Sequence, residues 1–344
     1  MSLLLSALLA LAVSAVVAEG FRRWALQRQL LDVPNARSSH TSPRPRGGGV
    51  GIVVGFMAGL AVWLASGGTL SPRALGGLLG ALLIAGVSFA DDLHSLPAWL
   101  RLVVHVLAAA ILTVAGVQPG SVSLLLTVPL ALVWITLVTN VYNFMDGIDG
   151  LAATQAVIAG LAFGGAGAIV GNELIQAAGP VLAAASAGFL VHNLPPARLF
   201  MGDVGSTFLG FVFAGLALLA NLGVGGQRLP IGFAIAVLAP FLFDAVVTLA
   251  RRIVQHERFF EPHRSHYYQR LVQLGLSHRQ VTSLYGSLAV LAAAAALAGL
   301  LVDSPVRQPL VLLLAYLPMV GVAVGVWRLE RAHRPVVPYV SHQS

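Results

Sequence analysis

Long apolar runs alternate with short polar segments along the whole chain. A helix needs about 20 consecutive apolar residues to cross the hydrocarbon core of a bilayer. Such runs predict about eleven spanning helices, near residues 3–19, 47–66, 73–90, 99–117, 122–139, 151–170, 176–193, 206–222, 229–250, 281–302 and 309–327. We therefore expect an all-α, polytopic integral membrane protein that folds as a single transmembrane domain over residues 1–344.

The polar segments between the predicted spans fall alternately on two sides of the membrane. One side holds all but three of the 20 arginines, the exceptions being Arg73, Arg228 and Arg307. Because cytoplasmic loops are enriched in basic residues, this side is predicted to be cytoplasmic, with the N-terminus outside and the C-terminus inside. Its segments are residues 20–46, 91–98, 140–150, 194–205 and 251–280, together with the C-terminal tail.

The first apolar run resembles a secretory signal peptide that would end near Ala18. A signal peptide normally begins with a basic segment. Here no basic residue precedes the run, and six arginines follow it between Arg22 and Arg46. We therefore expect this run to remain in the protein as its first span.

The overall composition excludes a water-soluble domain. Apolar residues make up 57% of the chain and charged residues 10%, with a mean hydropathy of +0.85, whereas a soluble domain carries about 25% charged residues. Cysteine is absent, which removes disulfides, thiolate metal sites and thiol nucleophiles. The pI near 10.7 would suit a nucleic-acid partner, but the arginines flank apolar segments. They favour membrane orientation, and no nucleic-acid partner is expected.

Acidic residues gather on the same predicted side, which membrane orientation does not require. Only Glu173 and Asp303 lie clearly on the other side. The pair Asp91-Asp92 directly follows an apolar run, and adjacent carboxylates repel each other unless a cation lies between them. The pair therefore predicts a Mg²⁺ or phosphate-chemistry site, with a solvated helix cap as the alternative.

Four oxygen-bearing side chains recur at every third position between residues 140 and 150. On an α-helix each step of three lags by about 60°, so neighbouring members share a face. Gly147 and Gly150 should break the helix and let the segment curl its side chains toward one point. Carboxylate and amide oxygens suit a hard divalent ion, whereas a plain turn is the alternative. The four residues are Asn140, Asn143, Asp146 and Asp149.

Two further cytoplasmic segments carry candidate site residues. Asp203 lies between two glycines, which allow a ligand to approach the backbone closely. His263, Arg264 and His266 can bind a diphosphate through charge-assisted hydrogen bonds. A zinc site or a basic loop at the lipid headgroups remains the alternative for this second segment. The arginines of the first cytoplasmic loop, Arg46 among them, are explained by orientation alone.

Asp244 is different, because it lies within an apolar run shortly before Arg251 and Arg252. A carboxylate inside the membrane is costly and is a functional candidate by default. The alternative is a structural ion pair or hydrogen bond between helices.

Together these motifs resemble the polyprenyl-phosphate N-acetylhexosamine-1-phosphate transferase family, in matching order from Pro34 to about Arg270. The strongest elements are the Asp91-Asp92 pair and the stretches 140–151 and 201–206. The His-Arg-Ser-His sequence at 263–266 departs from the triple-histidine form of the peptidoglycan enzyme. It also differs from the His-x-His-His form of many GlcNAc-1-phosphate enzymes. It looks more like the O-antigen initiators that handle 6-deoxy amino sugars.

The resemblance implies an enzyme that moves a sugar 1-phosphate from a UDP-sugar to undecaprenyl phosphate and releases UMP. The expected donor is UDP-GlcNAc or a 6-deoxy sugar such as UDP-N-acetylfucosamine, and the product would start a cell-surface polysaccharide such as O-antigen. The enzyme would lie in the bacterial inner membrane among its lipids, with the active site on the cytoplasmic face and Mg²⁺, or Mn²⁺ in its place, as cofactor. Whether it forms a homodimer stays open.

The resemblance also suggests a role for each candidate residue. Asp203 would bind the metal together with Asp146 or Asp149, and Asp91 or Asp92 would orient or deprotonate the lipid phosphate. The substrate-binding group would be Asn140 and Asn143 at the uridine diphosphate, His263, Arg264 and His266 at the diphosphate, and Asp244.

Two other classes remain as alternatives. A CDP-alcohol phosphotransferase shares the opening Asp146-Gly147, but Thr154 stands where that motif has arginine. A polytopic transporter would carry polar residues near the centres of several spans, which are nearly bare here.

Overall fold

The chain is almost entirely helical in the computed structural model, which describes residues 2–33, 43–116, 124–257 and 263–332. Within these ranges the only paired strands are β1 (Leu31–Asp32) and β2 (Arg44–Pro45), which run antiparallel. The helices are α1 (Ser2–Gln27), α2 (Val50–Ala65), α3 (Pro72–His94), α4 (Ala98–Gly116), α5 (Leu124–Phe144), α6 (Leu151–Val170), α7 (Glu173–Asn193), α8 (Asp203–Asn221), α9 (Ile231–Val237), α10 (Ala239–Val254), α11 (Tyr267–Gln273), α12 (His278–Leu300) and α13 (Arg307–Ala332).

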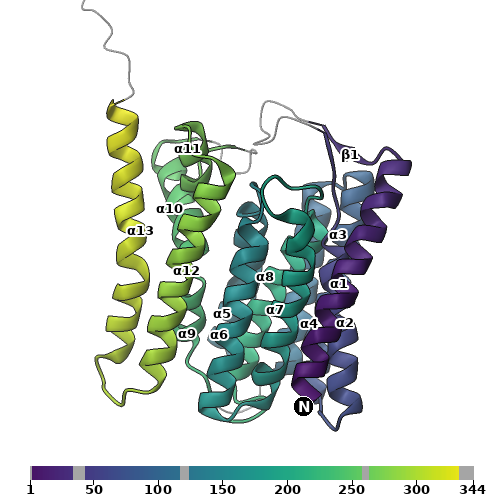
Figure 1. The fold of residues 1–344 in the computed structure, drawn as a ribbon. Coiled ribbons are helices and arrows are strands. Elements are labelled where there is room, and N and C mark those ends of the chain that lie inside the picture. Colours follow the sequence, from purple (N-terminus) through teal and green to yellow (C-terminus); the bar gives the residue numbers. More distant parts are fainter. Residues whose placement is uncertain (1, 34–42, 117–123, 258–262, 333–344) are drawn as a thin grey trace, which may run out of the picture.

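The long helices stand side by side as a bundle, with α1 and α2 at one edge and α12 and α13 at the other (Figure 1). Each predicted span coincides with a helix or, for 229–250, with the pair α9 and α10. Eight described helices are long and apolar enough to cross a membrane, and the bent pair is a ninth candidate. The prediction of an all-α polytopic membrane protein is therefore confirmed. The count of eleven additionally requires α4 and the 16-residue α2, only about 24 Å long, to cross.

Helix α1 is an integral part of the bundle. Gly51, Gly55 and Gly59 of α2 face it, each so near an α1 carbonyl oxygen that an added Cβ would lie 2.6–2.7 Å away. Small residues spaced by four let two helices in a membrane approach closely. The same stripe of α1 also packs against α7, where Gly188 lies against Leu11 O and Ser14. Removing this helix would thus expose packed faces of two others.

The span at 229–250 is bent, because α9 and α10 meet at 80°. Pro240 near the start of α10 lacks an N–H, which breaks the hydrogen-bond ladder. Two side chains satisfy carbonyls at the break: Gln155 Nε2 donates to Val237 O at 3.0 Å, and Tyr316 OH donates to Ile235 O at 3.1 Å. Within a membrane such freed carbonyls require protein partners. The bend is therefore a built feature of the bundle.

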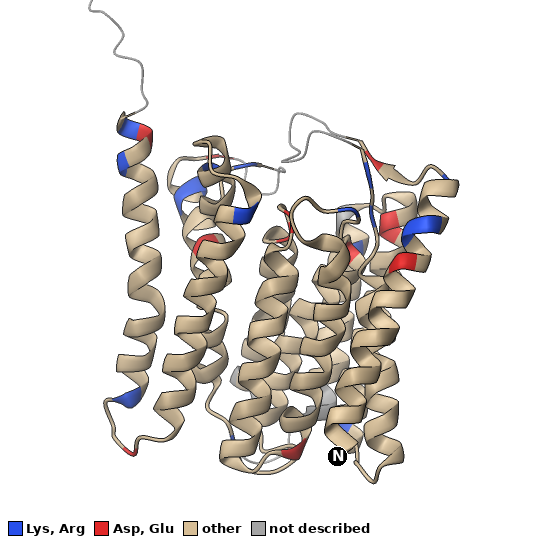
Figure 2. Ribbon diagram, viewed as in Figure 1, with Lys and Arg blue, Asp and Glu red and all other residues tan. Residues whose placement is uncertain are grey.

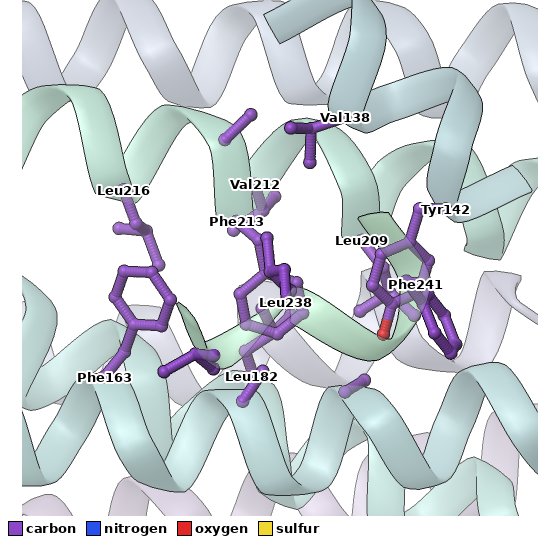
Figure 3. Close-up of a cluster of buried hydrophobic side chains, with 14 of the residues drawn as sticks. Val138, Tyr142, Phe163, Leu182, Leu209, Val212, Phe213, Leu216, Leu238 and Phe241 are labelled. Atoms are coloured by element: carbon purple, nitrogen blue, oxygen red, sulfur yellow. The ribbon is translucent and has the colours of Figure 1, made fainter. Parts of the chain in front are cut away.

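Helix α8 is the central helix, with every residue buried except Leu218 and Asn221. Aromatic side chains join it to its neighbours in the cluster drawn in Figure 3. The Phe213 ring lies 5.9 Å from that of Tyr142 and 5.8 Å from that of Phe163, and Tyr142 also meets Phe241 at 5.1 Å. This packing sets the positions of α5, α6 and α10 around α8.

Charged residues gather at one end of the bundle, the end that carries β1 and α11 (Figure 2). The opposite end shows only a few charged positions. The segments assigned to one side from sequence therefore do lie together, as far as the chain is described. Glu261 and the tail beyond residue 332 lie outside the described residues. The mid-bundle is nearly free of charge, which argues against the transporter alternative.

A buried asparagine stabilises the opposite end, and its removal is expected to destabilise the fold. The Asn172 amide accepts from Ile175 N at 3.3 Å and donates to Val224 O and Gln227 O at 3.1 and 3.0 Å. Asn172→Ala would remove this helix cap and leave the buried Val224 carbonyl and the partly buried Gln227 carbonyl without this partner, a loss of roughly 2 kcal/mol. The thermal unfolding midpoint in detergent should therefore fall.

The matched control is Asn221→Ala, which removes a single hydrogen bond to Leu229 O from a partly exposed side chain. Its midpoint should fall clearly less. Equal losses for the two variants would contradict the role given to Asn172.

Candidate active site

Three carboxylates meet where α3 ends and α8 begins. The Asp92 carboxylate accepts from Asp203 N at 2.9 Å and from Val204 N at 3.0 Å, and so caps the N-terminus of α8. Free N–H groups at a helix start favour a negative charge there. Asp91 instead accepts from Leu96 N in the turn after α3. The two adjacent acids therefore have different partners, and one of them holds Asp203 in place.

Two arginines lie between these carboxylates. Arg101 Nη1 is 2.8 Å from both Asp91 Oδ2 and Asp203 Oδ2. Arg46 contacts Asp203 and lies 3.0 Å from Asp92 Oδ1 through its Nε. Burial disfavours the charged Arg46, but the carboxylates of Asp203 and Asp92 outweigh this and raise its pKa. The cations allow three acids to share a partly buried space.

Sequence reasoning missed both arginines as site residues. Membrane orientation accounts for both Arg46 and Arg101 in the sequence, because both belong to the arginine-rich side. Backbone pairing brings Arg46 to the site, because Gly48 N donates to Phe200 O at 2.9 Å and Gly49 N donates to Met201 O at 2.8 Å. The run of three glycines after Arg46 was the available signal for this close approach.

The glycine beside Asp203 is required by the protein itself. Gly202 has φ +76°, a conformation that L side chains rarely adopt, and an added Cβ would lie 2.5 Å from Asp92 Oδ2. The glycines around Asp203 were predicted to let a ligand approach the backbone. At Gly202 the group that lies close to the backbone is the Asp92 carboxylate. Gly49 likewise lies against Gly205, where an added Cβ would be 2.3 Å from its Cα.

Two members of the Asn-Asp segment join the acid cluster, which we define as Asp91, Asp92, Asp146 and Asp203. The Asn143 side chain lies near Asp203 and favours its ionised form, lowering the pKa of that carboxyl. Asp146 lies in the turn after α5, where burial raises the pKa of its carboxyl well above the usual range; Arg46 opposes this shift, and Asp203 and Asp92 add to it. Four carboxylates against two guanidinium groups leave two negative charges uncompensated when all are ionised. A divalent cation would balance that excess.

The other two members of the segment lie elsewhere. Asn140 Nδ2 donates to Thr136 O of its own helix at 2.7 Å. Asp149 accepts from Ala197 N at 3.0 Å and lies 3.3 Å from His278 Nδ1. Burial would raise the pKa of Asp149, but the hydrogen bonds from His278 and Ala197 outweigh it and lower the pKa. The helix does break at Gly147 and Gly150, yet the four side chains do not converge on one point.

The Asp244 carboxylate fixes the start of α11 and the histidine segment, residues 263–266, that precedes it. Its buried carboxylate accepts from Tyr267 N at 2.8 Å, Tyr268 N at 3.0 Å and Tyr285 OH at 2.6 Å, and lies 3.2 Å from His266 Nδ1. It therefore satisfies the free N–H groups at the start of α11. This geometry matches the structural alternative considered for the residue.

The histidine segment lies beside the turn that contains Asp146. Tyr268 OH donates to Phe144 O at 2.9 Å, and the His266 ring lies 6.2 Å from that of Phe144. His263 packs on His266 at 5.0 Å between ring centroids. Burial, helped by His266 and nearby arginines, lowers the pKa of His263 to about 4. Near neutral pH its imidazole is therefore uncharged.

The described residues contain no ready-made group of three or more histidines or acids around one ion position. Mg²⁺ is usually bound by one or two carboxylates, with substrate phosphates and water completing its shell. Asp203 and Asp146 are hard oxygen donors of that kind. A zinc cage at the histidine segment finds no support in the described residues.

The sequence is similar to that of known membrane enzymes. The model of glycosyl transferase family 4 matches residues 74–221. A probable undecaprenyl-phosphate N-acetylglucosaminyl 1-phosphate transferase of Bacillus subtilis is 34% identical over 75% of this chain and 74% of its own length. A decaprenyl-phosphate N-acetylglucosaminephosphotransferase of Mycobacterium leprae is 30% identical over 73% of this chain and 72% of its own.

The structural role of Asp244 can be tested on the protein without any substrate. In Asp244→Asn, one carboxylate oxygen that accepts hydrogen bonds is replaced by an amide NH₂ group, which donates and therefore faces other donors. The negative charge is also lost. We expect a loss of roughly 3–5 kcal/mol, seen as a lower unfolding midpoint and faster tryptic cleavage after Arg264. Asp303→Asn, at the opposite end of the bundle, is the control and should behave like the wild type. Unchanged stability of Asp244→Asn would favour a role in substrate binding instead.

Proposed function

The chain belongs to glycosyl transferase family 4, the polyprenyl-phosphate N-acetylglucosamine-1-phosphate transferases, and on that premise we propose the reaction of this enzyme. An oxygen of a polyprenyl phosphate attacks the β-phosphorus of a UDP-N-acetylhexosamine. The bond between the β-phosphorus and the bridging oxygen breaks, and UMP leaves. The product carries the sugar on a lipid diphosphate. The acid cluster between α3, α5 and α8 is the observation that supports this proposal most directly.

The acid cluster suits a reaction in which three phosphates converge. Bound Mg²⁺ would neutralise phosphate charge and polarise the β-phosphoryl group. Asp203 and Asp146 would hold it, and Asn143 would help to keep the Asp203 carboxylate ionised. Arg46 and Arg101 stand beside the same carboxylates and offset the remaining repulsion. Asp91, paired with Arg101, would orient the acceptor phosphate.

The remaining candidates support the site or bind the donor. We assign Asp92 to the cap of α8, where it accepts from Asp203 N. We assign Asp149 to a structural contact, because it accepts from Ala197 N and lies 3.3 Å from His278 Nδ1 of α12. His263, Arg264 and His266 would bind the donor diphosphate from the side of α11. Their attachment next to the Asp146 turn supports this assignment. Asn140 would contribute to the nucleotide through its Oδ1, because its Nδ2 donates to Thr136 O.

The donor and setting are part of the same proposal. The names of the relatives favour UDP-GlcNAc, with undecaprenyl phosphate or another polyprenyl phosphate as acceptor. The product would begin a lipid-linked cell-surface polysaccharide. The enzyme would lie in the inner membrane with the charged end of the bundle facing the cytoplasm. UDP-N-acetylfucosamine, suggested by the His-Arg-Ser-His sequence, is the competing donor.

Purified enzyme with undecaprenyl phosphate, Mg²⁺ and a panel of UDP-sugars tests this reaction. We expect UMP and a lipid-linked product with UDP-GlcNAc. Asp203→Asn should lower kcat at least about 100-fold, because it weakens the metal site and the pairing with both arginines. Asp303→Asn, a carboxylate change at the other end of the bundle, should leave kcat unchanged. Absence of turnover with every UDP-N-acetylhexosamine would refute the proposal.

Metal dependence is a separate expectation. Chelation with EDTA should abolish UMP release, and added Mg²⁺ should restore it, because the carboxylates and substrate phosphates together form the ligand set. Mn²⁺ should substitute in part, since it also prefers oxygen ligands. Full activity in EDTA would remove the metal from the proposed mechanism while leaving the transfer reaction standing.

A further inference from the structure

A buried histidine next to the acid cluster has one ring nitrogen that makes no hydrogen bond with the described residues. His105 lies on α4, one turn after Arg101, and only 6% of its surface is exposed. Its Nδ1 is fully buried and makes no hydrogen bond with any described residue. The imidazole interacts electrostatically with Asp203 and Arg101, which places it beside the cluster. The Nδ1 of His105 therefore has the capacity to form a hydrogen bond with a ligand.

The neighbouring polar side chains differ from His105. Ser88 and Thr207 hydrogen-bond to each other at 2.8 Å, one turn below the carboxylates of α3 and α8. On α5, Thr139 Oγ1 donates to Ile135 O at 2.7 Å. Buried polar groups are normally paired, because an unpaired one forfeits the hydrogen bonds it made in water. The unpaired Nδ1 of His105 therefore differs from the buried hydroxyls of Ser88, Thr207 and Thr139, which are all hydrogen-bonded.

The depth of His105 indicates which substrate it would meet. Residues four apart lie on one face of a helix, about 6 Å apart along its axis. Helix α4 starts near the charged end of the bundle, so His105 lies deeper in the bilayer than Arg101. A nucleotide-sugar reaches the cluster from water, whereas a lipid phosphate reaches it from the membrane. A polar atom on the membrane side of the cluster is thus placed for the lipid phosphate.

Building on the proposed function, we propose that His105 is a further binding residue for the acceptor, and that its imidazole hydrogen-bonds to the phosphate monoester of the polyprenyl phosphate. Arg101 would neutralise the same phosphate from the aqueous side. The hydrogen bond fixes the headgroup at the membrane edge of the cluster, next to Asp91 and Asp203. No proton transfer is required of His105.

Three substitutions at this position separate hydrogen bonding from packing. His105→Leu removes both ring nitrogens, His105→Asn keeps an amide group near the place of Nδ1, and His105→Gln keeps one near the place of Nε2. We expect the leucine variant to raise KM for undecaprenyl phosphate about tenfold, the effect of one lost hydrogen bond. KM for the UDP-sugar should stay within about twofold of wild type. The asparagine variant should recover most of the loss, and the glutamine variant less.

His192→Leu is the matched control, because His192 is similarly buried and its Nδ1 also lacks a hydrogen bond, but it lies between α7 and α1. It should leave KM for both substrates unchanged. If His105→Leu does not fold, the comparison of the asparagine and glutamine variants decides. The assignment would be overturned if KM for undecaprenyl phosphate were the same in the wild type and in the asparagine and glutamine variants. A folded leucine variant, if obtained, would then also show an unchanged KM for this lipid.

A binding measurement separates this inference from the proposed reaction. Undecaprenyl phosphate alone, without UDP-sugar, should raise the thermal unfolding midpoint of the detergent-purified wild type, and this shift should shrink in His105→Leu. Lipid-dependent stabilisation that needs His105, in a protein without turnover, would refute the reaction but keep the lipid site. Turnover with a stabilisation indifferent to His105 would refute the inference alone. A wild type that neither turns over nor responds to the lipid would refute both.

Discussion

The pairing of three carboxylates with two guanidinium groups at the start of α8 is the interaction on which the candidate site depends. Carboxylates from separate helices repel each other in a partly buried space, and only nearby cations make their convergence tolerable. Arg46 arrives with the glycine run before α2, and Arg101 arrives at the start of α4. The cluster therefore joins α2, α3, α4 and α8 at one end of the bundle. Because α8 is buried almost throughout, its N-terminus is also a fixed reference point for the surrounding helices.

The acids of this end divide into two groups by their partners. Asp92, Asp149 and Asp244 accept from backbone N–H groups of other segments, and each thereby fixes a helix start or a loop. Asp91, Asp146 and Asp203 face arginines or one another, with fewer backbone contacts. The first group preorganises the second, since a site built for charged substrates must hold its charges in place before they bind. Acidic residues with similar positions in the sequence thus perform distinct tasks.

Much of the architecture was predictable from the sequence, because the length and hydropathy of an apolar run identify a spanning helix. The gathering of Asp91, Asp146 and Asp203 at one end also followed from counting spans. Three features did not follow. Arg46 and Arg101 were hidden because arginines at helix ends are expected in any membrane protein. The separate tasks of Asp146 and Asp149 depend on which distant N–H groups meet them. The bend at 229–250 had a local signal in Pro240, but the side chains that complete it come from α6 and α13.

The charge balance of the cluster constrains the order in which ligands bind under the proposed function. With Asp146 protonated, as its raised pKa favours, the cluster carries an excess of one negative charge, which becomes two once that proton leaves, and both proposed substrates are anionic. Neither phosphate is attracted to such a site on its own, because like charges in a partly buried space repel strongly. A divalent cation that binds together with the donor diphosphate removes this excess, and the donor phosphate oxygens complete its coordination. The acceptor then meets a compensated site, with Arg101 at the water side and the bilayer behind it. Charge compensation therefore favours binding of the metal–donor complex before the lipid phosphate.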